Sequence, residues 1–240
     1  MWLGASKDRP DQPLGLTWVR KMKILGVVFG TISTEMENWQ PKIDKLEKTL
    51  NLWKSRSLSY VGKCLIVNVL GLSKLLYLAR ILILPGWVAA LVNSLLWPFI
   101  WGSRIETVSR KTCCLLSKAG GLNLVHLGWK SESLRLASVL STLDSADDSY
   151  FSMCKYFIGG RLSTLHEHWS KLRDLSTPCA ATPTLFYLSC LAILDKIIGR
   201  CDEFSSKQIY RALMSADVSP PVLPYQWSMF VGSTFSLQRH

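Results

Sequence analysis

The apolar spacing between Glu35 and Lys54 constrains the fold more than any other feature of this sequence. Large apolar side chains recur there at intervals of four and three residues, at Trp39, Ile43, Leu46, Leu50 and Trp53. Because an α-helix has about 3.6 residues per turn, all five fall on one face. The opposite face carries Lys42, Asp44, Lys45, Glu47 and Lys48. We therefore predict an amphipathic helix over 35–54, with Ser33 or Thr34 as its N-cap.

Two more helices are predicted directly after this one. A polar break, Ser55 to Ser59, precedes an apolar stretch that continues to about Ile83, and Ser59 is suited to cap it. The side chains expected to face inward are Val61, Leu65, Leu72, Leu75 and Leu76. Pro85-Gly86 predicts a turn. The third helix follows it and should bury Trp87, Leu91, Leu95 and Trp97. Three helices with short connections predict an antiparallel bundle.

The flanking regions complete a mainly α fold. The β-branched and aromatic segment Lys23–Gly30, bracketed by glycines, predicts a strand pair or a bent strand. Residues 102–128, around Gly120-Gly121, are expected to be irregular or short-stranded. Further helices are predicted at about 130–143, 163–174, 184–198 and 205–215, and the Pro-rich tail 218–225 should be extended. We expect a short β-hairpin, a three-helix bundle and a loosely packed helical C-terminal region.

The positive charge is concentrated in the first half of the chain. Of a net charge of +11, residues 1–120 contribute +10, with 17 Lys and Arg against 7 Asp and Glu. Residues 121–240 contribute +1, with 11 against 10. A basic region indicates a polyanionic partner, either nucleic acid or an anionic membrane surface, although ordinary solubilising charge gives the same count.

Residues 81–103 contain no charged side chain, so a transmembrane segment has to be considered. Pro85, Gly86 and Pro98 interrupt the stretch, and about 12 residues after the break are too few for a bilayer, which needs about 20. A buried helix is the better interpretation.

The cysteines and the N-terminus indicate the compartment of the protein. The seven cysteines are scattered, which indicates reduced thiols, and the charged residues among 1–15 indicate that there is no signal peptide. We expect an intracellular protein of the nucleus or cytoplasm.

A series of motifs in fixed order resembles a known family. It begins with Lys23-Ile24-Leu25-Gly26 and Gly30, continues with Asn38-Trp39, and then has Trp53-Lys54-x-Arg56-x-Leu58-Ser59-x-x-Gly62-Lys63. Next come Leu72-Ser73-Lys74-Leu75-x-Tyr77, Leu84-Pro85, Phe99-Ile100-Trp101, Val108-Ser109-Arg110 and Gly120-Gly121-Leu122-Asn123-Leu124. Over about residues 20–140 this resembles the thumb and post-thumb region of non-LTR (LINE-type) retrotransposon reverse transcriptases. Residues 141–230 resemble the looser segment that follows it.

The resemblance implies a division of the chain and a set of roles. Residues 1–34 would be a palm remnant, 35–103 a thumb-like bundle, 104–145 a Gly-Gly linker and helix, and 146–240 a post-thumb helical region. The hairpin residues Leu25, Gly26, Val27 and Gly30 would form a primer-grip-like element. A plain edge hairpin is the alternative interpretation. The catalytic carboxylates of the family would precede residue 1, so we expect no polymerase activity, no enzyme function and no cofactor.

The expected nucleic-acid site lies between the first two helices. Lys54, Arg56, Ser59 and Lys63 gather there, and Lys74 follows in the second helix. Lysine, arginine, hydroxyls and helix N-termini are the groups that bind phosphates. In the family the thumb follows the backbone of a template–primer duplex. The implied partner is RNA or DNA, contacted without sequence preference; a solvated corner is the alternative.

Three further motifs resemble functional sites, but we interpret each of them as structural or solvent-exposed. Asp147-Asp148 resembles a polymerase metal motif but sits in a polar loop after the thumb, which indicates a solvated turn. Trp39, Trp53, Trp97 and Trp101 could stack on bases, yet helical spacing places the first two in the core. His166, His168, Cys154 and Cys179 match no zinc spacing, so no metal is expected.

Two further hypotheses stay open beside nucleic-acid binding. One is a translated retroelement remnant without function. The other is a membrane protein anchored by residues 81–103.

Overall fold

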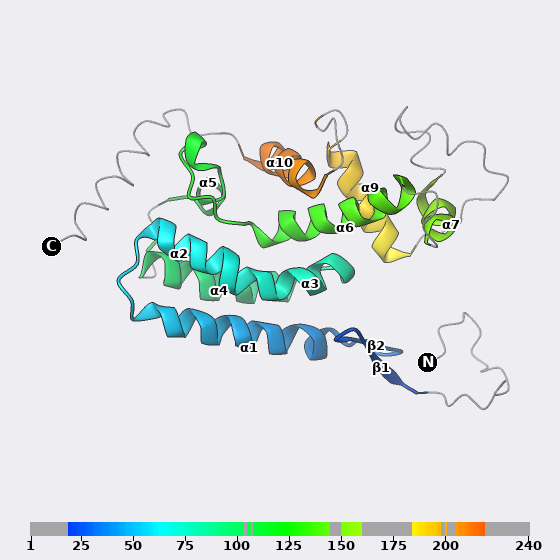
Figure 1. Ribbon diagram of the computed structural model, residues 1–240, viewed down its shortest axis with the longest axis horizontal. Helices are drawn as coiled ribbons and strands as arrows, with labels where there is room; N and C mark the ends of the chain where they lie inside the picture. The colour runs from blue at the N-terminus through cyan, green and yellow to red at the C-terminus, as the bar shows by residue number, and fades with distance from the viewer. Residues whose placement is uncertain are drawn as a thin grey trace.

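The computed structural model describes residues 19–102, 105–106, 108–144, 150–159, 184–197, 200 and 205–218. These form a mainly helical fold that begins with a two-stranded antiparallel hairpin, so the predicted fold class is confirmed (Figure 1). The predicted helix at 163–174 and the tail after Val218 lie outside the described residues. So do Asp147, Asp148, His166, His168, Cys179 and Cys201.

The segment Lys23–Gly30 belongs to a strand pair, as predicted. β1 (Lys21–Ile24) pairs with β2 (Val27–Gly30), with Ile24 opposite Val27 across a two-residue turn. Both turn residues have positive φ, 48° at Leu25 and 84° at Gly26. Such a turn twists in the same sense as the strands it joins. Glycine adopts this backbone at no steric cost, which explains Gly26, whereas Leu25 adopts it against the usual preference of residues with a Cβ.

An asparagine holds the hairpin against the first helix, α1 (Glu35–Lys54). The Val28 N–H donates to Asn38 Oδ1 at 2.8 Å, and Asn38 Nδ2 donates to the Val28 carbonyl at 2.8 Å. The side-chain amide thus occupies the place of a neighbouring strand. Thr34 precedes α1 as predicted, but its hydroxyl donates to the same Val28 carbonyl instead of capping the helix. The N-cap prediction is therefore wrong in its chemistry.

α1 buries the predicted face. Trp39, Ile43, Leu46 and Leu50 lie in the core, and Trp53 packs partly buried at its edge. The second helix begins at Tyr60 with Ser59 as its cap, since the Gly62 N–H donates to Ser59 Oγ at 3.2 Å. That cap was predicted correctly.

The second helix is not a regular α-helix, and this changes its buried face. It consists of α2 (Tyr60–Ile66), a π-helical stretch η2 (Val67–Leu72) and α3 (Ser73–Ile81), and it ends two residues before the predicted Ile83. Leu72 and Leu75 are buried and Leu76 is partly buried, as predicted. Val61 and Leu65 were also expected inside, but they are 45% and 59% exposed.

The π-helical stretch explains that error. A π turn holds about one residue more than an α turn, so the helix before it is rotated by about 100° relative to a regular pattern. The inward positions of α2 move by one residue in consequence. Cys64 and Val67 are buried, and Leu65 faces outward.

The third helix, α4 (Gly86–Trp101), follows Pro85 as predicted and ends at Gly102, whose φ is 71°. It lies beside α1 and α2, which completes the three-helix bundle (Figure 1). Val88, Val92 and Leu96 form its buried face, together with the aromatic residues of its last turns. Trp97 is buried and Trp87 and Leu95 are partly buried, but Leu91 is exposed, so its predicted burial is wrong.

The charge-free segment 81–103 is divided between the end of α3, the connection 82–85 and α4. With 16 residues, α4 is about 24 Å long, shorter than a hydrocarbon core of about 30 Å. A different helix, Tyr60–Ile81, has 22 residues and is long and apolar enough to cross a membrane, since the mean hydropathy of its most apolar 18 residues is 1.7. Core helices of soluble proteins pass the same test, and 39% of its most apolar window is buried in the bundle.

The Gly-Gly segment is irregular, with two short helical turns, α5 (Arg110–Cys113) and η3 (Ser117–Ala119). A Cβ at Gly121 would lie 2.0 Å from the Leu115 carbonyl oxygen, so no other residue fits there. A second asparagine holds this segment to the bundle. Asn68 Nδ2 donates to the Asn123 carbonyl at 2.9 Å, and Asn68 Oδ1 accepts from the Val125 N–H at 2.9 Å.

The remaining helices continue the core of the bundle. α6 (Leu127–Asp144), α9 (Leu185–Ile197) and α10 (Ser206–Asp217) agree with the predicted helices, and α7 (Phe151–Cys154) leads into a π-helical turn, η4 (Lys155–Gly159). α6 lies between α3 and α10 (Figure 1). The five described cysteines, Cys64, Cys113, Cys114, Cys154 and Cys190, are buried, and none of them forms a disulfide with another described residue.

Candidate nucleic-acid interface

The four residues Lys54, Arg56, Ser59 and Lys63 lie around the connection from α1 to α2, which we call the corner. Lys54 is the last residue of α1, and Arg56 lies in the connection. Ser59 precedes α2, and Lys63 is in its first turns. The structure therefore brings the predicted set together, but its members make very different contacts.

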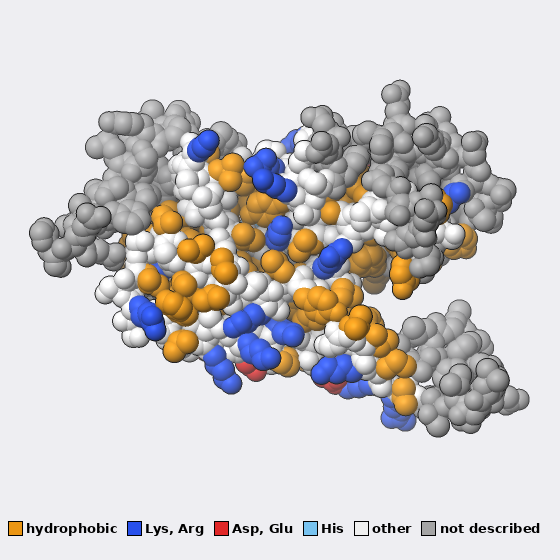
Figure 2. Space-filling model, viewed as in Figure 1, with side chains coloured by type: hydrophobic (Ala, Val, Ile, Leu, Met, Phe, Trp, Pro, Cys, Tyr) orange, Lys and Arg blue, Asp and Glu red, His pale blue; other side chains and the backbone are white. Residues whose placement is uncertain are grey.

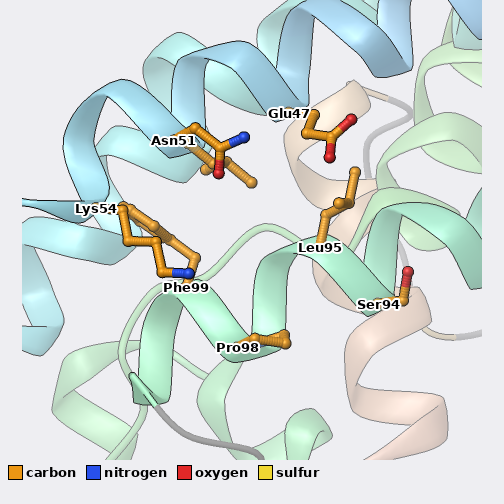
Figure 3. Close-up of a pocket in the computed structure, with 8 residues that line it drawn as sticks. Glu47, Asn51, Lys54, Ser94, Leu95, Pro98 and Phe99 are labelled. Atoms are coloured by element: carbon orange, nitrogen blue, oxygen red, sulfur yellow. The ribbon is translucent and has the colours of Figure 1, made fainter.

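Lys54 and Arg56 are exposed. The guanidinium of Arg56 lies 4.5 Å from the centre of the Trp53 ring, which orients it by a cation–π contact and leaves its edge in solvent. Lys54 borders a cavity of about 140 Å³ between α1 and α4, with Glu47 and Asn51 on the α1 side and Leu95 and Pro98 on the α4 side. Figure 3 shows the Lys54 side chain extending across this cavity toward Phe99.

The Lys63 side chain makes its contacts within the protein. Its Nζ donates to the Ile100 carbonyl at 3.1 Å, at the C-terminal end of α4, and lies 5.6 Å from the Tyr60 ring centre. A cation at this position satisfies a helix-end carbonyl and complements the helix dipole. Partial burial lowers the pKa of Lys63. The Ser59 hydroxyl oxygen caps α2, which leaves the hydroxyl proton available to donate. Lys54 and Arg56 are thus the cationic phosphate-binding candidates of the corner.

Lys74 lies away from the corner. Its Nζ donates to Thr49 Oγ1 and, at 3.4 Å, to the Lys45 carbonyl, so it bridges α3 and the middle of α1. These contacts tie the ammonium group of Lys74 to the fold.

The hairpin residues form the opposite end of the bundle. Leu25 is 85% exposed at the turn and Val27 is buried. A Cβ at Gly30 would meet Thr34 Cγ2 at 2.9 Å. Tyr77 Oη donates to the Leu25 carbonyl at 2.9 Å and tethers the tip to α3. Since the 20 residues of α1 span about 30 Å, the hairpin and the corner are separate surfaces at its two ends (Figure 1).

Three tryptophans of the bundle belong to its core. Trp39, Trp97 and Trp101 are buried, and the Trp101 ring lies 5.2 Å from Tyr60. None of the three presents a face on which a base could stack. In the described part of the chain, no three His, Cys, Asp or Glu side chains lie close enough to hold a metal ion.

The sequence interpretation missed the polar residues that join segments far apart in the chain. Asn38 and Asn68 each bind one N–H and one carbonyl of another segment. The Trp129 indole N–H donates to Asp217 Oδ2 at 3.0 Å, and the His126 N–H donates to Tyr210 Oη at 3.1 Å, which docks α10 on α6. An asparagine within a helix that otherwise has apolar inward positions was the available signal, but its partner cannot be deduced from spacing.

The electrostatics of the bundle favour an anionic ligand. Between Lys42 and Arg80 the chain has eight Lys and Arg against two carboxylates, Asp44 and Glu47. Among the described residues, none of these eight cations lies within 4.0 Å of a carboxylate. Figure 2 shows Lys and Arg side chains spread over this face, with very few Asp or Glu.

Comparison with protein-family models finds no match for this chain, and no curated protein matches it.

Proposed function

We propose that this chain binds the phosphate backbone of RNA or DNA without reading base sequence, as a reverse-transcriptase-like thumb region without polymerase activity of its own. The observation that carries the proposal is the set of bundle cations that have no carboxylate partner in the part of the chain that the structure describes. Cations that neutralise phosphates release counterions, which supplies most of the free energy of sequence-independent binding. The buried tryptophans support backbone contacts rather than base stacking.

The test is a salt titration of duplex binding. Each phosphate contact contributes about 0.9 to the log–log slope of affinity against salt on B-form DNA, so Lys54→Ala with Arg56→Ala should reduce the slope by about 1.8. The loss should be equal on two duplexes of unrelated sequence. A matched control removes two exposed charges elsewhere, Lys118→Ala with Lys196→Ala, and should change the slope less. Equal slopes for the wild type and the Lys54/Arg56 variant would reject the corner as an interface.

Polymerase chemistry is tested separately. With primer–template, Mg²⁺ and nucleotides, the purified chain should extend no primer. Extension that disappears in Asp147→Asn or Asp148→Asn would overturn the proposal, because polymerases use carboxylates to hold two metal ions.

A membrane-associated role is the second candidate, favoured by one observation. The outer face of α2 and η2 exposes Val61, Leu65 and Val69, spaced four residues apart, within the helix that is apolar enough to cross a membrane. Figure 2 shows apolar side chains gathered over this part of the surface. Co-sedimentation with neutral vesicles, lost in Leu65→Asp, would favour this role. Binding to neither vesicles nor duplex would favour a remnant without function.

A further inference from the structure

A cleft of about 290 Å³ opens where α3, α6 and α10 meet, and neither the corner nor the hairpin includes it. Its polar lining consists of Arg80 from α3, Ser138 and Ser141 from α6, and Ser205 and Ser206 at the start of α10. Leu134 and Ala137 form its apolar floor. We call this the serine cleft. No Asp or Glu is among the described residues that line it.

Arg80 is oriented across the serine cleft. Its Nε donates to Ser138 Oγ at 2.6 Å, and the Ser138 hydroxyl donates in turn to the Leu134 carbonyl at 2.9 Å. The hydrogen bond uses one of the five guanidinium N–H donors, and Arg80 is exposed. In the described residues no carboxylate pairs with Arg80. The guanidinium is therefore held in place with most of its donors available, as recognition of a phosphate requires.

The opposite wall supplies hydroxyl groups. Ser205 Oγ accepts from the Gln208 N–H at 3.3 Å, which leaves its own hydroxyl proton available to donate. Ser206 follows as the first residue of α10 and borders the same cleft. A group entering between α3 and α10 would thus meet one fixed guanidinium and two hydroxyls.

More cations continue from the serine cleft along α6 and α10. Lys130 shares the outer face of α6 with Leu134, Ser138 and Ser141, at helical intervals of four, four and three. Its Nζ lies 6.0 Å from the Tyr210 ring centre on α10. Lys207 and Arg211, four residues apart, are exposed on α10. Figure 2 shows Lys and Arg side chains over α6 and α10 on this face, whereas its few visible acidic side chains lie over α1.

Two acidic residues of these helices, Glu132 and Asp217, are paired elsewhere. Glu132 lies 4.0 Å from Lys196 of α9, and Asp217 accepts from Trp129 and lies 3.9 Å from Lys111. The described surface from Arg80 to Arg211 thus carries four cations on three helices, α3, α6 and α10. It is longer than a single phosphate could contact, which favours a polymer of phosphates over a free anion.

We propose that the serine cleft binds one phosphate of a nucleic-acid backbone through Arg80 and the hydroxyls of Ser205 and Ser206, and that Lys130, Lys207 and Arg211 contact the neighbouring phosphates. This inference rests on the proposed function and extends it to a second surface. Phosphate-directed donors carry no base information, so binding here is also independent of sequence.

The test compares Arg80→Gln, Arg80→Lys and the triple change Arg80→Gln, Lys207→Gln, Arg211→Gln in duplex salt titrations. Arg80→Gln should reduce the log–log slope by about 0.9 and the triple change by about 2.7. Arg80→Lys keeps the charge and should keep the slope, but lose affinity several-fold because the fixed fork of donors is gone. A photo-crosslinking residue in place of Ala137, on the cleft floor, should crosslink to the duplex and lose the crosslink when Arg80→Gln is added.

The outcomes separate this inference from the function on which it rests. A wild type that binds no nucleic acid would overturn both. A wild type that binds, with the slope lowered by the Lys54/Arg56 variant but not by Arg80→Gln or the triple change, would overturn the serine cleft alone. Unchanged duplex binding together with lost binding of the triple variant to phosphatidylserine vesicles would assign the surface to lipid headgroups and would also reject the proposal.

Discussion

The corner and the serine cleft are built from the same kinds of residue, yet they leave different donors available. Each has a basic side chain, serine hydroxyls and the start of a helix. In the corner, Lys63 is bound to the Ile100 carbonyl, so one of its three cations serves the fold, whereas Ser59 and Ser205 cap their helices in the same way. In the serine cleft, Arg80 makes one hydrogen bond through Nε and keeps its remaining N–H groups. The difference teaches that a cluster of cations and hydroxyls in a sequence does not show which of them can meet a ligand.

The largest expected effect tests what the two surfaces share. Trp39 is fully buried on the α1 face of the bundle that supports both, so Trp39→Ala should lower the free energy of unfolding by about 3–5 kcal/mol. Trp53→Ala should cost less, because Trp53 is only partly buried. Urea denaturation measures both. Lys45→Ala on the exposed side is the control, and an equal loss there would mean that the helical face has been assigned wrongly.

The next effect sharpens the distinction within the corner. Lys63→Met should reduce stability by about 1–3 kcal/mol, because the Ile100 carbonyl loses its donor, and should barely change the salt slope. Arg56→Ala should do the reverse, with a stability change of at most about 0.5 kcal/mol. Urea denaturation measures the stability of both variants, and salt titration of duplex binding measures their slopes. A large slope change in Lys63→Met would show that Lys63 meets phosphate after all.

A smaller effect distinguishes the serines. Ser59→Ala removes the cap of α2 and should cost about 0.5–2 kcal/mol, measured by thermal or urea unfolding. Ser206→Ala should leave stability nearly unchanged, because Ser206 is not the capping residue of α10. Duplex affinity should respond in the opposite order. Equal affinities for Ser206→Ala and the wild type would remove Ser206 from the proposed site.

The smallest effect is a pH dependence confined to the cleft side of the molecule. His126 Nδ1 accepts the Trp129 N–H at 3.2 Å at the start of α6, and burial lowers the pKa of His126. The folded state therefore favours the neutral imidazole. Its contribution is complete above the unfolded pKa of about 6.5 and decreases as the pH falls below that value. The protection factors for amide hydrogen exchange in α10, which correct for the intrinsic pH dependence of exchange, should fall between pH 7.5 and 5.5, while those in α1 should not change with pH. His126→Asn should abolish the difference; an equal change in both helices would refute it.

Much of the helical architecture could be predicted because its causes are local. The spacing of Trp39, Ile43, Leu46 and Leu50 is that of one helix face, and Pro85-Gly86 interrupts the chain between α3 and α4. The same periodicity, continued across η2, wrongly predicted that Val61 and Leu65 are buried. Nothing in their spacing reveals the additional residue of a π turn. A pattern that assumes 3.6 residues per turn loses the buried face after one such irregularity.

The candidate sites were predicted only in part. The sequence pointed to the corner by its concentration of cations and hydroxyls, and to the hairpin by its glycines. It gave no sign of the serine cleft, because Arg80 and Ser138 are 58 residues apart and Ser206 is more distant still. The resemblance to reverse-transcriptase thumbs concerns residues 20–140, and α10 lies beyond that range.

By itself, the sequence determined approximately where the longer helices lie, which face of α1 is apolar, and that the first half of the chain is basic, since these depend on neighbours within a turn or two. The tertiary structure decided which polar groups remain available. Lys63 is occupied by a carbonyl 37 residues away, and Asn68 holds a segment 55 residues away. Whether a donor meets solvent or another part of the protein depends on such long-range contacts, and burial then sets the cost of leaving either partner unpaired.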